Sequence, residues 1–428
     1  MANDVRSFQV RLPPQPASVG EARRMVRRSL VLGGRDDLVE TAELLVSEVV
    51  TNALVHAGTP IDVALSVKHD GLRVEIGDES PHLPSRRRYG PTAGTGRGLL
   101  MLERLVSDWG VVASRRGKTV WFHLSDSRLE SESTQGKGPS TAEDRPGRAV
   151  SVELLNVPLL LHAAWQQHAE SLLREYLLAS LDSGLDEDAI QVHAEASDAM
   201  ALLAEHIPRP DVGEDASQVM ADAVEPKVSS SRVEMPVPEQ SISHFDTLNR
   251  SLETALVMAD TGTFLTPAIQ PELRTLRGWL CGEVDAQAMG AAPTPWSTEG
   301  HPEPASREAP DWNAGSVNDS TQSLVAADDT SRVIAVSQAV LDLLGYEDRD
   351  ELVGQRLVQV IPARYRQAHL AGFTMHFLTG RSPLLGRAIV VPALCNNGKE
   401  LLVELVINSH PVPRGRVVFI AELRRTDN

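Results

Sequence analysis

The chain lacks the features that mark secreted and membrane-spanning proteins. Of its 428 residues only two are cysteines, Cys281 and Cys395, and they lie far apart in apolar surroundings. Two distant thiols build neither a disulfide framework nor a thiolate metal site, so we expect a reducing compartment. No apolar run approaches the length of a membrane-spanning helix, and the first ten residues lack the apolar core of a signal peptide. The sequence therefore predicts a cytoplasmic protein with no membrane contact.

The chain also lacks the positive charge that nucleic-acid binding requires. Its net charge is −17, and acidic and basic residues nearly balance before residue 126, so most of the acidity lies later. A protein that neutralises phosphates along a duplex needs an excess of lysine and arginine. The run Arg86-Arg87-Arg88 is too short to form such a patch. We therefore expect no direct nucleic-acid partner.

Stretches rich in Ser, Pro, Gly, Asp and Glu divide the chain into parts. Such stretches are poor in large apolar residues and are typical of linkers. They predict a first domain, a helical region with a linker inside it, and a last domain. The predicted bounds are 1–125 for the first domain, 126–148 for a linker, 149–290 for the helical region with its internal linker near 208–240, 291–320 for another linker and 321–428 for the last domain.

A helix-like segment over residues 43–57 carries three polar side chains four residues apart. Glu48, Asn52 and His56 fall on one helical stripe, because i, i+4 and i+8 lie on the same face. On periodicity alone, this pattern is equally typical of a helix with a partly wet edge and no ligand. The apolar residues that we expect on the neighbouring, core-facing side are Leu44, Leu45, Val49 and Ala53.

Two further features follow this helix in order. Asp78 ends an apolar strand-like run, which is a common place for a side chain that contacts a ligand. A glycine-rich loop over residues 94–100 then precedes a predicted helix. Glycine lets backbone N–H groups approach phosphate oxygens closely, and a helix N-terminus adds its dipole. A lone loop of this kind is weak evidence, but here it completes a series of acid–amide helix, strand-end aspartate and glycine-rich loop.

This series resembles the Bergerat-fold ATPases, which include gyrase, sensor histidine kinases and mismatch-repair ATPases. The segment SEVVTNALVHA is most similar to the bacterial anti-sigma-factor serine kinases, and the likeness covers roughly residues 5–125. The resemblance implies that Glu48 is a general base, that Asn52 binds Mg²⁺ bridging the phosphates of ATP, and that Asp78 accepts the adenine amino group. It also implies that Thr119 lies near the adenine. The residues implied in the lid over the phosphates are Gly94, Gly96, Arg97, Gly98 and Leu99.

One position departs from the family pattern. Bergerat domains usually continue Asp-x-Gly, whereas this chain has Asp78-Glu79-Ser80. The missing glycine predicts a different turn beneath the adenine. Because Glu48 and Asn52 are both present, we favour a competent ATP site over a decayed one.

The middle of the chain has leucine and alanine at helical spacing and no glycine-rich or metal-like motif. Helices are predicted over residues 152–182, 188–206, 242–260 and 271–284. The histidines there are scattered singly, which is typical of ordinary helix residues. A helical bundle that transmits a signal or mediates homodimerisation is our expectation.

The last domain resembles a PAS sensor domain. A strand over 333–337 and a helix over 339–346 match its first elements, and three strands are predicted over 386–394, 400–409 and 417–423. Asn396-Asn397-Gly398 is a hairpin turn between the first two of these strands. The overall prediction is thus a multidomain α+β chain with an N-terminal Bergerat α/β sandwich, a central α-helical region and a C-terminal PAS-like antiparallel sheet with helices.

His369 matches the place where haem-binding PAS domains carry their axial histidine. A neutral imidazole in an apolar pocket is a suitable haem ligand. Many PAS domains with the same local sequence bind no haem, and there the histidine packs within its helix. We favour this second interpretation.

Three functions fit these features. The first is a regulatory serine/threonine kinase of the anti-sigma type, which phosphorylates a small partner such as an anti-anti-sigma factor and is modulated by the PAS domain. The second is a catalytically silent, nucleotide-dependent partner-switching protein that sequesters a sigma factor. The third is a sensor histidine kinase, which is disfavoured because those enzymes place the phosphoacceptor histidine before the ATPase domain.

Overall fold

A computed structural model describes most of the chain. The described residues are 6–68, 71–79, 105–114, 117–125, 149–183, 189–210, 212, 221–267, 270–297, 310–380, 384–413 and 416–426. The chain divides into two compact units. The first comprises residues 1–151, 173–205 and 236–255, and the second comprises 152–172, 206–235 and 256–428.

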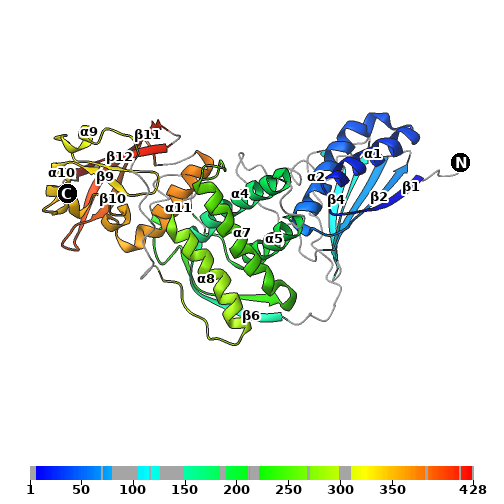
Figure 1. The fold of residues 1–428 in the computed structure, drawn as a ribbon, viewed down its shortest axis with the longest axis horizontal. Helices are drawn as coiled ribbons and strands as arrows, with labels where there is room; N and C mark the ends of the chain where they lie inside the picture. The colour runs from blue at the N-terminus through cyan, green and yellow to red at the C-terminus, as the bar shows by residue number, and fades with distance from the viewer. Residues whose placement is uncertain are drawn as a thin grey trace. The chain divides into compact units, whose positions relative to one another are not determined.

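The first unit contains a five-stranded antiparallel sheet of order β1-β2-β3-β5-β4. Figure 1 shows α1 and α2 together over one face of this sheet. A 3₁₀ turn, η1, separates the two helices. The bounds are β1 Arg6–Leu12, α1 Ala17–Leu32, η1 Asp36–Leu38, α2 Val39–Ala57, β2 Ile61–Lys68, β3 Gly71–Asp78, β4 Asp108–Ser114 and β5 Gly117–Ser125.

Alternation along the strands explains why the helices cover one face only. In β2, every second side chain from Ile61 to Val67 is buried and the others are partly or fully exposed. A strand sends successive side chains to opposite faces, so this pattern places one apolar row beneath the helices. Leu30 of α1, Leu45 of α2 and Phe122 of β5 are completely buried in the shared core. The predicted α/β sandwich with helices on one sheet face is therefore confirmed.

The C-terminal segment forms a second five-stranded antiparallel sheet, of order β10-β11-β12-β8-β9. The predicted strands and the hairpin at Asn396-Asn397-Gly398 are present, and Gly398 has a φ of 79°. One strand, β8, precedes those we predicted. The bounds are α9 Gly315–Asn318, β8 Leu324–Ala327, β9 Val333–Val336, α10 Gln338–Leu344, η3 Arg349–Glu351, η4 Leu357–Val360, α11 Ala363–Thr379, β10 Ala388–Leu394, β11 Glu400–Val412 and β12 Arg416–Arg425.

The middle of the chain is mostly helical, but it also contains a two-stranded sheet, β6-β7. We predicted a helix from residue 152, whereas the chain is a strand until Pro158 and the helix begins at Leu159. The second strand lies inside the stretch predicted as an internal linker. The bounds are β6 Ala149–Pro158, α4 Leu159–Ser183, α5 Ala189–His206, β7 Ser229–Pro238, η2 Glu239–Ser241, α7 Ile242–Asp260 and α8 Pro271–Ala288.

The physical reason for this correction lies in strand pairing. Residues 152–158 carry apolar side chains that suit a helix or a strand equally, and a short apolar run does not distinguish the two. Their pairing partner, β7, comes some 70 residues later in the chain. The predicted linker 126–148 and residues 298–309 of the linker 291–320 fall outside the described residues, and the domain boundaries stay predictions.

Candidate functional site

The polar stripe predicted on α2 is present. Glu48 and Asn52 are both half-buried, one helical turn apart. Val49 and Ala53, one position further along the chain, are 4% and 5% exposed and belong to the core. The two polar side chains therefore lie along the border between the packed face of the helix and its accessible face. The side chain of His56 lies outside the described residues.

Leu44 corrects our prediction of the core-facing side. It is 43% exposed, whereas the adjacent Leu45 is completely buried. Leu44 precedes Glu48 by four residues, so it lies on the same stripe as Glu48 and Asn52 rather than on the apolar side. The polar stripe thus begins with an exposed leucine.

The end of α2 is held against the end of β3. The helix ends at Gly58, which has left-handed backbone angles (φ 59°, ψ 17°), and its N–H donates to the carbonyl of Leu54. The next residue, Thr59, accepts a hydrogen bond at its Oγ1 from the backbone N–H of Glu79, at 3.0 Å. Because Glu79 directly follows Asp78, this bond ties the helix end that follows Asn52 to the strand end that carries Asp78.

Glu79 is also fixed by its side chain. Arg11 of β1 donates to the Glu79 carboxylate and, at 3.1 Å, to Asp62 of β2. Both acidic partners raise the pKa of the Arg11 guanidinium, with the Glu79 hydrogen bond as the main cause. The residue at the second position of the altered Asp-x-Gly pattern is therefore bound to the neighbouring strands. Ser80, at the third position, lies outside the described residues.

Asp78 is buried and forms an ion pair with Lys118. The Lys118 Nζ donates to Asp78 Oδ1 at 3.0 Å, and the two side chains are 7% and 2% exposed. Asp78 lies opposite Lys118 in the β3–β5 register, which brings the two side chains to the same face of the sheet. That face is the one covered by α1 and α2, since Ile76 and Val120 belong to the core.

Thr119 lies on the other face of the sheet. It is paired with Gly77, and both are partly exposed, in step with the alternation of β3 and β5. A Cβ atom on Gly77 would lie 3.4 Å from Thr119 Oγ1, so the two residues face each other. A side-chain period of two sends neighbouring residues to opposite faces. Lys118 is therefore the β5 residue beside Asp78, and the placement of Thr119 near the adenine stays a prediction.

The lid residues that the sequence predicts fall outside the described residues. These are Gly94, Gly96, Arg97, Gly98 and Leu99. The structure thus brings together α2 and the ends of β3 and β5, and the lid stays a prediction.

The chemistry of the described side chains suits a magnesium nucleotide. Mg²⁺ takes oxygen ligands, keeps several waters and uses one or two protein groups plus phosphates. The half-buried amide of Asn52 is such a ligand, and the Glu48 carboxylate lies one turn away on the same accessible edge. Within the described ranges, no group of three or more His, Cys, Asp or Glu side chains could hold a metal ion. A site that relies on one amide and on phosphate oxygens needs no such group.

His369 is not arranged as a haem ligand. Its side chain is partly buried in α11, and its Nε2 lies 3.0 Å from the Ser331 hydroxyl. The ring also contacts Phe373, which in turn contacts Phe419 of β12, with ring centroids 5.9 and 5.1 Å apart. The imidazole is thus hydrogen-bonded and packed against an aromatic ring. The haem alternative is not supported, and the packing interpretation accounts for this histidine.

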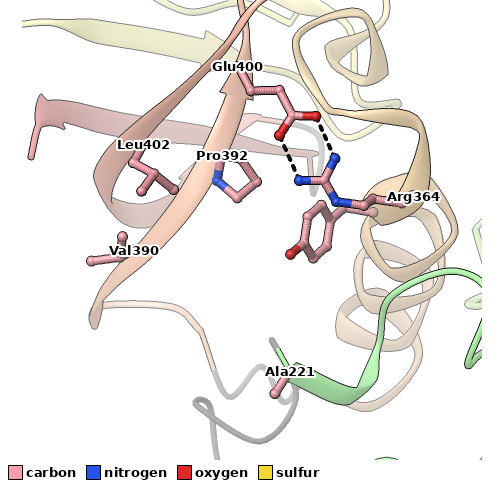
Figure 2. A pocket seen from close by; sticks show the side chains of 7 residues that line it. Ala221, Arg364, Val390, Pro392, Glu400 and Leu402 are labelled. Atoms are coloured by element: carbon pink, nitrogen blue, oxygen red, sulfur yellow. Dashed lines mark hydrogen bonds and ion pairs between the residues drawn. The ribbon is translucent and has the colours of Figure 1, made fainter.

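The second unit has a pocket of its own, of about 380 Å³. Figure 2 shows Arg364 of α11 and Glu400 of β11 facing each other at its wall, joined by two hydrogen bonds of 2.5 and 2.6 Å. The Arg364 guanidinium lowers the pKa of Glu400. None of the site residues predicted from the sequence lines this pocket. Its lining residues are Ala221, Arg364, Tyr365, Val390, Pro392, Glu400 and Leu402.

Sequence reasoning missed the residues that connect the predicted ones. Lys118 stood beside the predicted Thr119, and only its register opposite Asp78 distinguishes the two. Thr59 joins the end of α2 to the end of β3 by accepting a hydrogen bond from the backbone of Glu79, for which the sequence carries no signal.

In the part of the chain that the structure describes, no helix is long and apolar enough to cross a membrane.

Comparison with solved structures finds PAS domains. The chain is similar to the PAS domain of an HTR-like protein from Haloarcula marismortui, with 18% identity, 26% of this chain and 93% of that chain covered, and a TM-score of 0.20. It is also similar to the PAS domain of nitrogen regulation protein NR(II) from Vibrio parahaemolyticus, with 19% identity, 26% and 96% coverage, and a TM-score of 0.20. Likenesses of this size carry no argument about what this chain binds.

Comparison with known sequences concerns the first sheet and its helices. An uncharacterized protein from Azorhizobium caulinodans is 29% identical over 106 residues, which is 24% of this chain and 14% of that protein. The match thus spans well under two thirds of that relative. The family model of the histidine kinase-like ATPase domain matches residues 12–124, a range that includes α2, Asp78 and Lys118. The N-terminal part of this chain is therefore a histidine kinase-like ATPase domain.

Proposed function

We propose that this chain is a regulatory, ATP-dependent serine/threonine protein kinase of the anti-sigma type. It transfers the γ-phosphate of ATP to a serine or threonine of a small partner protein, such as an anti-anti-sigma factor or a sigma factor. The PAS-like segment and the middle helices modulate its output. This function places it in the cytoplasm, as a homodimer, with no nucleic-acid or membrane partner.

One observation carries the proposal. Within an ATPase domain of the histidine kinase type, Glu48 and Asn52 lie one turn apart on the accessible edge of α2. The Thr59–Glu79 hydrogen bond ties the end of that helix to the strand that carries Asp78. A module that only binds a nucleotide needs no carboxylate beside the metal-binding amide. A kinase does, because the attacking hydroxyl must be oriented and must lose its proton.

The residues have separate roles in this proposal. Asn52 is the protein ligand for Mg²⁺, which when bound neutralises charge on the phosphates. Glu48 orients the hydroxyl of the partner and accepts its proton, and Asp78 accepts the amino group of adenine. The lid residues 94–99 cover the phosphates. Phosphoryl transfer depends on positioning and charge neutralisation more than on covalent chemistry by the protein, which suits this small set of groups.

Calorimetric titration of the full chain with Mg·ATP tests the proposal. We expect saturable binding by the wild type and its loss in Asn52→Ala. Glu40→Gln, an exposed position at the start of the same helix, is the matched control and keeps wild-type affinity. A wild type that does not bind Mg·ATP contradicts the proposal, since every role above requires the nucleotide.

The alternative is a catalytically silent partner-switching protein that binds a nucleotide and sequesters its partner. The sequence Asp78-Glu79-Ser80 favours it, because Ser80 stands where the family pattern has glycine. Incubation with radiolabelled ATP and purified anti-anti-sigma proteins separates the two functions. Label that is stable to acid on the partner supports the kinase, and binding without transfer supports the alternative. Label on this chain that is labile to acid and stable to base indicates a histidine kinase.

A further inference from the structure

The pocket beside the start of α11 combines two opposite charges with an apolar wall. Arg364 and Glu400 face each other there, joined by hydrogen bonds of 2.5 and 2.6 Å (Figure 2). Its volume of about 380 Å³ lies within the range of small-molecule sites. The roles in the proposed function do not use this pocket. The other residues of the PAS-like segment that line it are Tyr365, Val390, Pro392 and Leu402.

The apolar wall lies on the outer face of the sheet. Pro392 of β10 is paired with Leu402 of β11, and Val390 shares their face because successive side chains of a strand alternate. The opposite face carries Val391 and Val403, which pack in the core. Val390 and Leu402, by contrast, are 56% and 48% exposed. The two strands therefore present accessible apolar surface in the same pocket as the ion pair.

The ion pair is itself accessible to a ligand. The Arg364 and Glu400 side chains are 42% and 38% exposed, and a pair this accessible contributes little to stability. A ligand with only a carboxylate would bind Arg364 and leave Glu400 without its partner, and a ligand with only an ammonium group would do the reverse. A ligand that carries both charges compensates both side chains when it separates them.

We propose that this pocket binds an apolar α-amino acid in its zwitterionic form. The carboxylate of the ligand accepts two parallel hydrogen bonds from the Arg364 guanidinium, which suits the planar geometry of both groups. The ammonium group of the ligand donates to Glu400. The apolar side chain of the ligand packs against Val390, Pro392 and Leu402. This site is separate from the proposed nucleotide site, so the inference does not depend on the proposed function.

Calorimetric titration of the full chain with L-leucine and two analogues, without nucleotide, tests the proposal. 4-Methylpentanoate is leucine without its ammonium group, and 3-methylbutylamine is leucine without its carboxylate. We expect L-leucine to bind at least about tenfold more tightly than either analogue, because each analogue lacks one charge-assisted contact. Glycine keeps both charges but lacks the apolar side chain, and it binds more weakly than L-leucine by a similar factor.

Substitutions locate the binding. Arg364→Gln and Glu400→Gln each remove one charge from the pocket, so we expect the affinity for L-leucine to fall about tenfold or more in both. Arg73→Gln is the matched control and keeps wild-type affinity. Arg73 is likewise 42% exposed, is paired with a glutamate, Glu75, and stacks over an aromatic ring, as Arg364 does.

Three results overturn the inference. The first is a wild type that does not bind L-leucine. The second is an analogue that binds as tightly as L-leucine, because the pocket then does not require both charges. The third is wild-type affinity in Arg364→Gln and Glu400→Gln, which places the amino acid elsewhere. If a variant does not fold, the comparison of L-leucine with its analogues on the wild type decides. Binding of Mg·ATP is measured separately, so these results leave the proposed function unaffected.

Discussion

Gly58 and Ala194 approach each other so closely that a Cβ atom on Gly58 would lie 2.6 Å from the Ala194 Cβ. Gly58 ends α2, directly before the threonine that is bound to the end of β3, and Ala194 lies in α5. Ile190 of α5 also packs against the core of the ATPase domain. Within the first unit, a helix of the middle region therefore rests on the end of the helix that carries Glu48 and Asn52 (Figure 1).

The first prediction concerns this contact. Gly58→Ala adds a methyl group at a left-handed backbone position and pushes it into Ala194, so we expect a loss of about 2–4 kcal/mol in stability. Gly34→Ala is the control, because Gly34 is also left-handed (φ 69°) but has nothing within 4 Å of an added Cβ. It should lose only about 1 kcal/mol. Urea denaturation midpoints compare the two, and equal shifts would mean that α5 does not rest on Gly58 in solution.

The second prediction concerns the proposed general base. Glu48→Gln keeps the size and hydrogen-bonding capacity of the side chain but removes its basicity. We expect the rate of phosphate transfer to the partner to fall by about 10²–10⁴-fold, while calorimetric affinity for Mg·ATP is unchanged. Glu40→Gln again serves as the control. Transfer at the wild-type rate in Glu48→Gln would remove Glu48 from the catalytic roles.

The third prediction concerns pH. Burial, and to a lesser extent the nearby Arg356, lower the pKa of His369 from 6.5 to about 4. The unfolded chain binds this proton near pH 6.5 and the folded chain near pH 4. The stability that the neutral ring contributes is therefore fully present above about pH 6.5 and is lost as the pH falls toward 4. The size of the loss is on the order of 3 kcal/mol.

Two buried histidines, His162 and His193, act in the same direction. Burial lowers the pKa of His162 to about 3 and that of His193 to about 4. The measurement is the urea midpoint from pH 7 to pH 4 for His369→Gln and for the exposed control His410→Gln. The first variant should lose less stability across this range than the wild type, and the control should follow the wild type. Identical slopes in all three proteins would contradict the assignment.

The fourth prediction concerns a helix start that depends on a distant residue. The Oε1 of Gln367, in α11, accepts hydrogen bonds from the backbone N–H groups of Leu160 and Leu161 at 2.7 and 3.3 Å. The first N–H groups of a helix have no partner within it, so Gln367 caps α4 from the PAS-like segment. Its own amide also donates to Ser229 and Glu225. Gln367 is 7% exposed.

Gln367→Leu keeps the volume but leaves these N–H groups buried without an acceptor. We expect a loss of about 2–3 kcal/mol in stability, measured by chemical denaturation. Gln338→Leu is the matched control, because Gln338 is exposed in α10 and its side chain donates to Asp342 on the same helix. A surface change of that kind is worth within about 0.5 kcal/mol. Equal effects of the two substitutions would contradict the capping role.

The sequence pattern was sufficient for a correct prediction where the evidence lies within a single helix, strand or motif. The spacing of Glu48 and Asn52 predicts their shared stripe because helical geometry relates i and i+4 directly. The apolar runs of the C-terminal segment likewise predict its last three strands and the hairpin at Asn396-Asn397-Gly398. The family resemblance then anticipated the ATPase domain over residues 12–124. Each of these predictions needs only the residues of a single helix, strand or motif.

Predictions failed where the secondary structure or exposure of a residue depends on contacts with a distant part of the chain. Residues 152–158 are a strand because β7, some 70 residues later, supplies a pairing partner. Leu44 is exposed because the packing of α2 on the sheet selects the Leu45 side. The neighbour of Asp78 was not predicted at all, because only the register of β3 and β5 places Lys118 opposite it.

The sequence by itself determined which chemical groups this protein has and in which elements they lie. Composition, periodicity and motif spacing are local properties, and they identify an acid–amide helix, a strand-end aspartate and two α+β folds. The tertiary structure decided what those groups contact: the lysine that holds Asp78, the threonine that joins two site elements, and the hydroxyl that bonds His369. These contacts depend on strand register and on packing between segments far apart in the chain, which no local pattern specifies, and the Lys118–Asp78 pair is also buried away from water.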